Sequence, residues 1–124
     1  MLDHISLGVR DLARAGAFYE AALAPLGYVR LFGNERGIGF GVPGAKDEAF
    51  AVLAIGESAA PSPGFHVAFA AKSRDAVDAF HAAALLAGAV DEGAPGLRPA
   101  YGETYYAAFV RDLDGHRVEA VCHG

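Results

Sequence analysis

The sequence has a single cysteine, Cys122, and no stretch rich in basic residues. One cysteine excludes a framework of intrachain disulfides and is typical of a reducing compartment. The net charge of −5 disfavours a nucleic-acid partner, because no basic run is present to neutralise a phosphate backbone. No apolar run approaches the ~20 residues that a membrane span requires, and segment 1–9 lacks the basic start of a signal peptide. We therefore expect a cytoplasmic protein without membrane or nucleic-acid partners.

The composition, in contrast, is that of a compact protein. Hydrophobic residues make up 53% of the chain and charged residues 20%, which is too apolar for a disordered chain. A chain of 124 residues buries a continuous core without disulfides or metals as staples. These features predict one domain over residues 1–124.

The sequence contains an internal repeat. Aligning His4 with His66 places segment 4–23 on segment 66–85 and matches Phe18 with Phe80. Each copy begins with alternating apolar residues, which predict a strand, and continues with helical periodicity. The first predicted helix covers about 12–23 and follows Asp11 as its N-cap. The second follows Ser73 and ends at Gly88.

Each predicted helix is followed by three short strands. In the first half these are 28–32, 38–42 and 49–55; in the second they are a weak run near 90, then 104–110 and 117–122. The segment Asp112–Gly115 is a strong turn signal, and 56–64 is the expected linker. The fold class is thus α+β, with one βαβββ module over about 1–55 and another over about 65–124. Since neither module can bury its sheet face alone, we expect the pair to form a cupped, mostly antiparallel sheet with the helices outside.

Strand alternation predicts which side chains face the concave side of this sheet. His4 and Ser6 face it in the first strand, His66 in the equivalent strand, and Glu119 in the last. Pairing the last two strands through the turn places Ala108 opposite Glu119, which also directs Tyr106 into the hollow. Two imidazoles and one carboxylate form a ligand set for a divalent metal such as Zn, Fe, Mn or Ni.

Each of these residues has a simpler interpretation when taken alone. A single His on an apolar strand is usually packed or at the rim, and a single Glu near the C-terminus is usually solvated. Their combination at matching repeat positions favours a metal site at His4, His66 and Glu119. Tyr101 and Tyr106 are further candidates as hydrogen-bond donors to a substrate, although aromatic packing explains them equally well. Arg98 is a candidate for guiding an anionic substrate.

Three segments, in order, carry a resemblance to a known family. They are LDHISLGVRDLARAGAFYEAAL, GFHVAFAAKSRDAVDAFHAA and YYAAFVRDLDGHRVEAV. Together they resemble the vicinal oxygen chelate superfamily, which includes glyoxalases, bleomycin-resistance proteins and dioxygenases. The resemblance implies paired βαβββ modules, with metal ligands on the first strand of each module and on the last strand of a module. In this chain those positions hold His4, His66 and Glu119.

One departure from the family concerns the last strand of the first module. Glyoxalase I carries a fourth ligand there, whereas the matching stretch here is EAFAVL and the position holds Val52. Val52 and Ser6 are therefore expected to line the substrate site. A three-ligand pattern is more similar to extradiol dioxygenases and fosfomycin-resistance transferases. However, the sequence shows neither the catalytic His typical of the former nor a basic cluster suited to a phosphonate.

The resemblance implies a metal-dependent lyase, isomerase or oxygenase acting on a small molecule with adjacent oxygens. Glu119, Tyr106 and Tyr101 are the expected catalytic residues, with Arg98, Ser6 and Val52 contacting the substrate. The alternative is a metal-free protein that sequesters a small molecule, as bleomycin-resistance relatives do. Because relatives commonly cover open sheet edges by two-fold pairing, we expect a homodimer.

Overall fold

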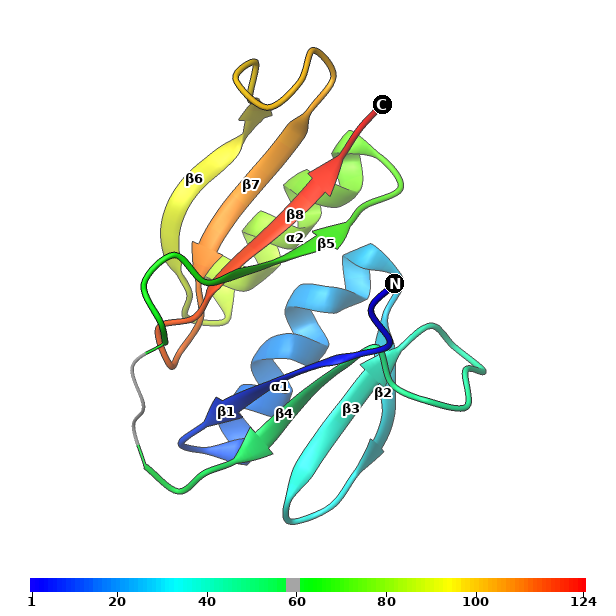
Figure 1. The fold of residues 1–124 in the computed structure, drawn as a ribbon, viewed down its shortest axis with the longest axis vertical. Helices are drawn as coiled ribbons and strands as arrows, with labels where there is room; N and C mark the ends of the chain where they lie inside the picture. The colour runs from blue at the N-terminus through cyan, green and yellow to red at the C-terminus, as the bar shows by residue number, and fades with distance from the viewer. Residues whose placement is uncertain (58–60) are drawn as a thin grey trace.

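The computed structural model describes residues 1–57 and 61–124, so part of the predicted linker, 58–60, lies outside the described residues. Each half follows the order strand, helix, strand, strand, strand (Figure 1). The first half consists of β1 (Ile5–Val9), α1 (Leu12–Leu23), a short 3-10 helix (Ala24–Leu26), β2 (Val29–Gly33), β3 (Gly37–Gly41) and β4 (Phe50–Ala54). The second consists of β5 (His66–Ala70), α2 (Arg74–Leu86), β6 (Val90–Leu97), β7 (Tyr106–Arg111) and β8 (Arg117–Cys122). The predicted pair of βαβββ modules is confirmed.

Local sequence signals set the ends of both helices. The side chain of Asp11 accepts a hydrogen bond from the backbone N–H of Arg14, and Ser73 does the same for Ala76. These bonds satisfy N–H groups that a helix leaves without partners in its first turn. Gly88 follows α2 with a φ of 108°, a backbone conformation that favours glycine. Both predicted helices are confirmed.

The strands form two open four-stranded sheets, ordered β1-β4-β3-β2 and β5-β8-β7-β6. In each sheet the first strand runs parallel to the last strand of its module, and the other pairs are antiparallel. The mostly antiparallel pairing is therefore confirmed, but the described residues form two sheets rather than one continuous sheet. As a result β1 and β5 are both edge strands.

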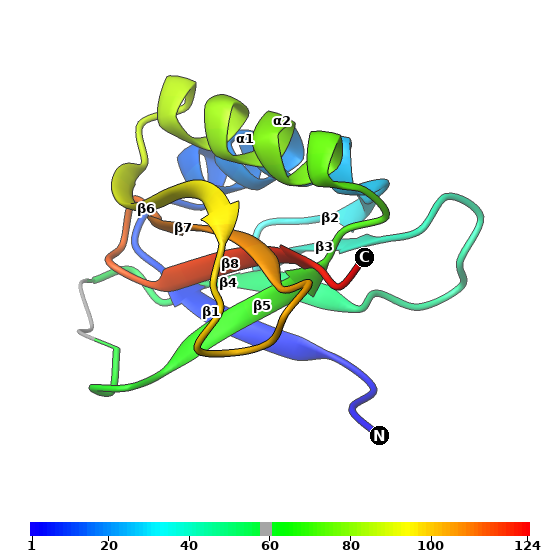
Figure 2. The ribbon, with the colours of Figure 1, turned by 90° about the horizontal axis from the view of Figure 1, so that it is seen from above.

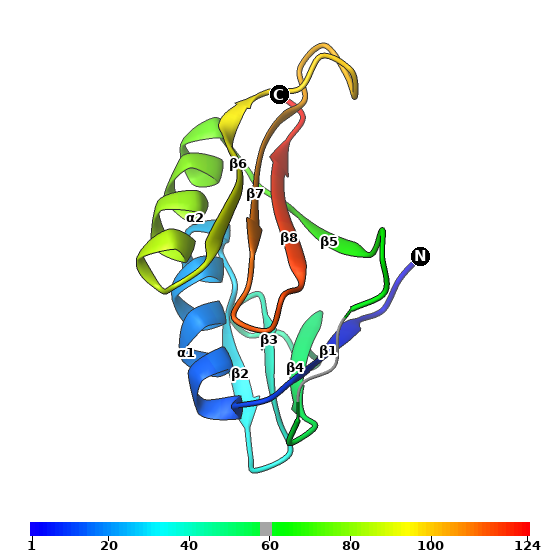
Figure 3. The same ribbon diagram turned by 90° about the vertical axis from the view of Figure 1, so that its left-hand side faces the viewer.

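The two helices cover the same side of the two sheets (Figures 2 and 3). Aromatic side chains join the modules inside this layer. The ring of Phe69 lies 5.2 Å from that of Phe50 and 5.8 Å from that of Tyr28, both in edge-to-face contact. Such contacts add to the stabilisation gained by burying the rings. No helix of the described residues covers the opposite side of either sheet.

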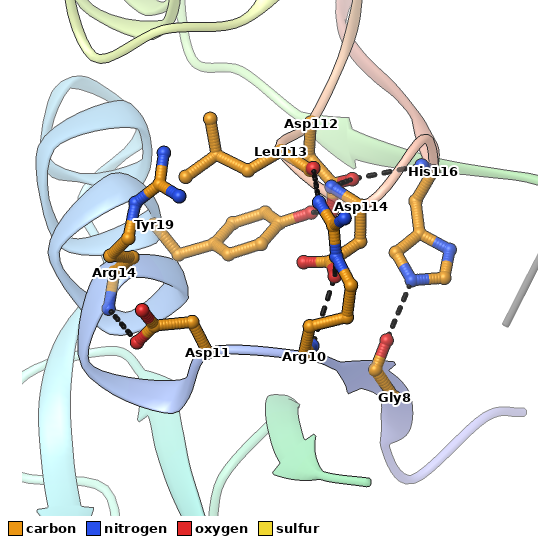
Figure 4. A network of polar contacts seen from close by, with 9 residues as sticks. All are labelled: Gly8, Arg10, Asp11, Arg14, Tyr19, Asp112, Leu113, Asp114 and His116. Carbon is orange, nitrogen blue, oxygen red and sulfur yellow. Dashed lines mark hydrogen bonds and ion pairs between the residues drawn. The ribbon is translucent and has the colours of Figure 1, made fainter. Parts of the chain in front are cut away.

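The turn between β7 and β8 fastens the second module to the first (Figure 4). Asp112, 5% exposed, accepts the hydroxyl hydrogen bond of Tyr19 from α1. The side chain of Arg10 donates to the carboxylate of Asp114, at 3.1 Å, and to the carbonyl of Leu113, at 2.7 Å. His116 Nε2 lies 2.9 Å from the carbonyl oxygen of Gly8 on β1. The turn is thus held by polar contacts to both β1 and α1.

Within residues 1–57 and 61–124, the longest apolar helical stretch falls short of what a membrane-crossing helix requires.

Candidate metal and substrate site

Two predicted metal ligands, His66 and Glu119, lie together on the uncovered side of the second sheet. β5 and β8 are parallel neighbours, and their register pairs Ala68 with Glu119. His66 Nε2 lies 3.1 Å from Glu119 Oε1. The side chain of His66 is 47% exposed, whereas that of Glu119 is 2% exposed. The pair therefore presents an accessible imidazole above a buried carboxylate; strand alternation predicted only that both side chains share this face.

The second oxygen of Glu119 is held by Tyr105, a residue that the sequence analysis missed. The Tyr105 hydroxyl donates a hydrogen bond to Glu119 Oε2. Its ring packs edge-to-face between those of Tyr101, at 5.4 Å, and His123, at 5.1 Å. Burial, together with the hydrogen bond to Glu119, raises the pKa of Tyr105 to about 12. Tyr105 is thus a neutral donor at physiological pH.

Tyr106, predicted to line the hollow, faces the other way. Its hydroxyl donates to Asp78 of α2 at 2.7 Å, and Arg74 of the same helix lies over its ring. The register of β7 and β8 pairs Phe109, not Ala108, with Glu119. The predicted register is wrong by one residue because the turn is longer than assumed: Asp112 pairs with His116 across it. A shift of one residue moves every side chain of a strand to the opposite face.

A cleft of about 500 Å³ opens over the His66–Glu119 pair. Its walls combine aromatic and charged side chains from β5, β6, β7, β8 and the loop before β7. The residues that line it include His66, Glu92, Tyr101, Tyr105, Phe109, Arg117 and Glu119. The predicted residue Tyr101 stands at this cleft with 68% of its surface exposed. Apolar walls with a few convergent polar groups are typical of a small-molecule site.

Three arginines converge beside this cleft, although they are scattered in the sequence. Arg111 and Arg117 both contact Oε1 of Glu92, at 2.6 and 3.5 Å. The guanidinium of Arg98 lies 5.5 Å from the centre of the Phe109 ring and donates to the carbonyl of Ala94. The sequence analysis found no basic cluster because these residues meet only through the pairing of β6, β7 and β8.

Comparisons with known proteins identify the family. A profile of the Glyoxalase/Bleomycin resistance protein/Dioxygenase superfamily matches residues 1–120. The chain belongs to this superfamily. The match covers both modules, so the resemblance carried by the three sequence segments is confirmed. No protein with a curated description matches the sequence.

Solved structures of the superfamily share the fold over nearly their whole length. A glyoxalase/bleomycin resistance protein from Albidiferax ferrireducens is 32% identical, with a TM-score of 0.85 over 100% of this chain and 99% of that one. The fosfomycin resistance protein FosX from Mesorhizobium loti is 22% identical, with a TM-score of 0.73, covering 100% and 92%. FosX from Listeria monocytogenes is 18% identical, with a TM-score of 0.72, covering 100% and 93%. At these identities the two FosX structures show a shared fold.

His4, the third predicted metal ligand, is not grouped with His66 and Glu119 within one chain. It precedes β1, is exposed, and hydrogen-bonds to the side chain of Asp3 at 2.7 Å. That hydrogen bond raises the pKa of His4 above its ordinary value. His4 and His66 line one groove of about 320 Å³ between β1 and β5. Among the described residues, no three His, Cys, Asp or Glu side chains are grouped closely enough to hold a metal.

The first module carries no carboxylate at the position equivalent to Glu119. Ser6 pairs with Ala51 on β4 as Ala68 pairs with Glu119 on β8, so the equivalent residue is Ala51, not Val52. Val52 is completely buried in the core and cannot contact a substrate, which corrects its predicted role. Ser6 lies exposed on the uncovered face, as predicted. The expectation that the first module supplies no fourth ligand therefore depends on Ala51, whose side chain cannot bind a metal, and not on Val52.

Proposed function

We propose that this protein is a divalent-metal-dependent enzyme that acts on a small molecule with two neighbouring oxygens. The single observation that carries the proposal is the pairing of a buried carboxylate, Glu119, with an accessible imidazole, His66, at the base of a cleft. A fully buried carboxylate is costly unless charge or hydrogen bonds compensate it. His66 and Tyr105 compensate this cost, one at each Glu119 oxygen, and a buried carboxylate held beside an accessible imidazole at the base of a cleft is a candidate for metal binding.

The donor atoms fit a divalent metal. Imidazole nitrogen and carboxylate oxygen are ligands for zinc, iron, manganese and nickel. His66 Nε2 and Glu119 Oε1 are adjacent, and the cleft beside them leaves space for substrate. Tyr105 occupies the other Glu119 oxygen, so it orients the carboxylate as outer hydrogen-bond partners do in metal sites.

The residues of this chain would then divide the work. His66 and Glu119 would hold the metal, which would supply Lewis-acid stabilisation of negative charge on the two substrate oxygens. Tyr105 holds Glu119 in place. Tyr101 and Phe109 line the cleft and exclude water from the body of the substrate. The reaction class is that of a lyase, isomerase or oxygenase.

The third ligand, His4, would be supplied by a second copy of the chain in a homodimer. Among the described residues, β1 and β5 are edge strands that pair on one side only, and such open edges are commonly covered by association. A two-fold pairing that sets β1 of one copy beside β5 of the other would bring His4 to the His66–Glu119 pair twice.

Subunit complementation tests this arrangement. The variants His4→Ala and His66→Ala should each lose tight metal binding. If ligands come from two chains, a heterodimer of the two variants contains one intact site, so co-expression should restore binding that neither variant shows alone. A monomer in light scattering, or no recovery in verified heterodimers, would contradict the shared site.

Activity is tested by comparing metal-loaded with chelator-treated protein on catechol and on an α-hydroxy ketone. The proposal expects turnover of at least one substrate class, dependent on metal and abolished in His66→Ala. The second candidate function, a metal-free binding protein, draws support from the aromatic lining of the cleft by Tyr101, Tyr105 and Phe109. That candidate instead expects equally tight ligand binding in chelator and in His66→Ala.

A further inference from the structure

We propose that the cleft of the second module recognises its substrate through a carboxylate, bound by Arg111 and Arg117. The inference rests on the proposed function in one respect, namely that this cleft is the substrate site. It adds the chemical class of the substrate, a small organic acid whose body lies against the aromatic lining of that cleft.

The first observation is an unfavourable pairing of like charges. Arg111 and Arg117 are directly opposite each other in the β7–β8 ladder. Like charges at opposite positions of an antiparallel pair destabilise a sheet. Among residues 1–57 and 61–124, Glu92 is the one carboxylate that contacts both guanidinium groups. Two cations share one anion, so this cluster has one unit of positive charge in excess, within a chain of net charge −5.

The second observation is that the cluster adjoins the site already described. Glu92 and Arg117 line the same cleft as His66 and Glu119. The Arg117 side chain is 60% exposed, so a ligand can reach it. The Nε atom of Arg111 is buried without a hydrogen-bond partner among the described residues. A guanidinium group donates in a planar fork that matches a carboxylate, and it does so with greater geometric specificity than a lysine.

The third observation concerns the surface between the two ends. Phe109 is opposite Glu119 on the neighbouring strand and two residues from Arg111. Its ring and that of Tyr101 line the same cleft as Arg117 and His66. A ligand with a carboxylate and a planar or apolar body therefore matches the cationic and aromatic side chains that this cleft combines.

A purely structural role accounts for this cluster less well. Exposed ion pairs contribute little to folding, and the opposed arginines add a repulsion that a neutral residue at 117 would avoid. A carboxylate ligand would offset that repulsion on binding. The Glu92 carboxylate then competes with the ligand carboxylate for the same two guanidinium groups. Removing the charge of Glu92 should therefore strengthen ligand binding.

The experiment uses phenylacetate as the probe, with the full chain kept in chelator and binding followed by NMR. We expect saturable shifts at Glu92, Phe109 and Arg117, with no saturable binding of the uncharged analogue phenylacetamide. Phenylphosphonate is a second arm that separates carboxylate recognition from general oxyanion recognition, and we expect it to bind more weakly. Binding of phenylacetamide equal to that of phenylacetate, or tighter binding of phenylphosphonate, would overturn the assignment.

Three variants complete the test. Arg117→Gln should weaken phenylacetate binding about tenfold, the effect of losing one charge-assisted hydrogen bond. Glu92→Gln should tighten it several-fold, and phenylacetate should raise its thermal midpoint more than that of wild type. Arg36→Gln removes one positive charge from an exposed turn of the first module and should change nothing. Absence of phenylacetate binding, or equal affinity in wild type and Arg117→Gln, would overturn the proposal.

The two proposals fail separately. Because the probe binds in chelator, loss of metal binding would contradict the metal enzyme and leave the carboxylate subsite standing. Absence of phenylacetate binding in protein that still binds metal would remove the subsite alone.

Discussion

Tyr105 donates its hydroxyl hydrogen bond to Oε2 of Glu119 and so fixes which oxygen of that carboxylate faces His66. Tyr105 lies in the loop before β7 and Glu119 on β8, and the Glu119 side chain has almost no contact with solvent. The orientation of the buried carboxylate therefore depends on a single hydroxyl group on one side and an imidazole on the other. A substitution of Tyr105 should therefore change metal binding at the proposed site and not only the stability of the fold.

The first prediction follows from this hydrogen bond. Tyr105→Phe removes the donor to Glu119 Oε2 while keeping the ring packed against Tyr101 and His123. The freed carboxylate loses its fixed orientation, so metal affinity should fall about 10- to 100-fold, as for other outer-partner losses. Calorimetric titration with zinc measures the affinity, and the absorption spectrum of bound cobalt reports the change in ligand geometry.

The matched control is Tyr101→Phe. The Tyr101 ring contacts that of Tyr105, but its hydroxyl makes no hydrogen bond to Glu119 among the described residues. This substitution should leave metal affinity and the cobalt spectrum unchanged. Equal effects of the two substitutions would show that Tyr105 acts through general packing, and the positioning role would be abandoned.

The second prediction concerns the contact between α1 and the β7–β8 turn. Tyr19→Phe leaves one oxygen of buried Asp112 without its hydroxyl donor and should lower the free energy of unfolding by about 1–3 kcal/mol. Denaturant unfolding measures this loss. Metal affinity should not change. An unfolding free energy equal to that of wild type would show that the Tyr19–Asp112 contact does not stabilise the fold.

The same contact has a pH dependence. Burial, and then the charge of Asp112, raise the pKa of Tyr19 well above its ordinary value of 10.0. Because the folded-state pKa is raised, the stabilisation is complete below pH 10 and is lost as pH rises through the folded value. Wild type should therefore lose more stability than Tyr19→Phe under alkaline conditions. Parallel alkaline profiles of the two proteins would contradict this origin.

The third prediction concerns the link between Arg10 and the turn. Arg10→Gln removes the side-chain bonds to Asp114 and Leu113 but keeps the bond from its own backbone N–H to Asp114. The Arg10 side chain is half exposed, so solvent screens the pair and the loss should be about 1 kcal/mol. Amide hydrogen exchange at 112–116 should accelerate. Arg14→Gln, at the same surface pocket, should stay within about 0.5 kcal/mol of wild type.

The sequence predicted the fold well because its signals are local or repeated. Asp11 and Ser73 mark the helix starts, and the internal repeat predicts both modules before any comparison. Strand alternation placed His66 and Glu119 on one face, since that inference needs only the direction of each strand. The division into two sheets was missed because edge pairing between distant strands leaves no mark in the sequence.

The error at Tyr106 has a physical cause in the turn. Gly115 adopts a φ of 90°, and Asp112 Oδ1 accepts hydrogen bonds from the backbone N–H groups of Asp114 and His116. These bonds enclose a longer turn than the one assumed, which shifts the register by one residue and brings Tyr105 rather than Tyr106 to Glu119. Likewise Ala51, not Val52, occupies the position equivalent to Glu119, because a single position decides which face a side chain takes.

The most direct test of the central claim is the metal content of wild type and Glu119→Gln. Both proteins are purified without chelator, loaded with zinc, and dialysed before elemental analysis. The substitution nearly preserves the shape of the side chain but removes the only anionic ligand of the proposed site. Zinc affinity should therefore fall by more than about 100-fold, the upper loss expected for an outer hydrogen-bond partner. We predict stoichiometric metal in wild type, little in Glu119→Gln, and a retained fold in both. Equal metal content in the two proteins, or none in either, would contradict the metal site.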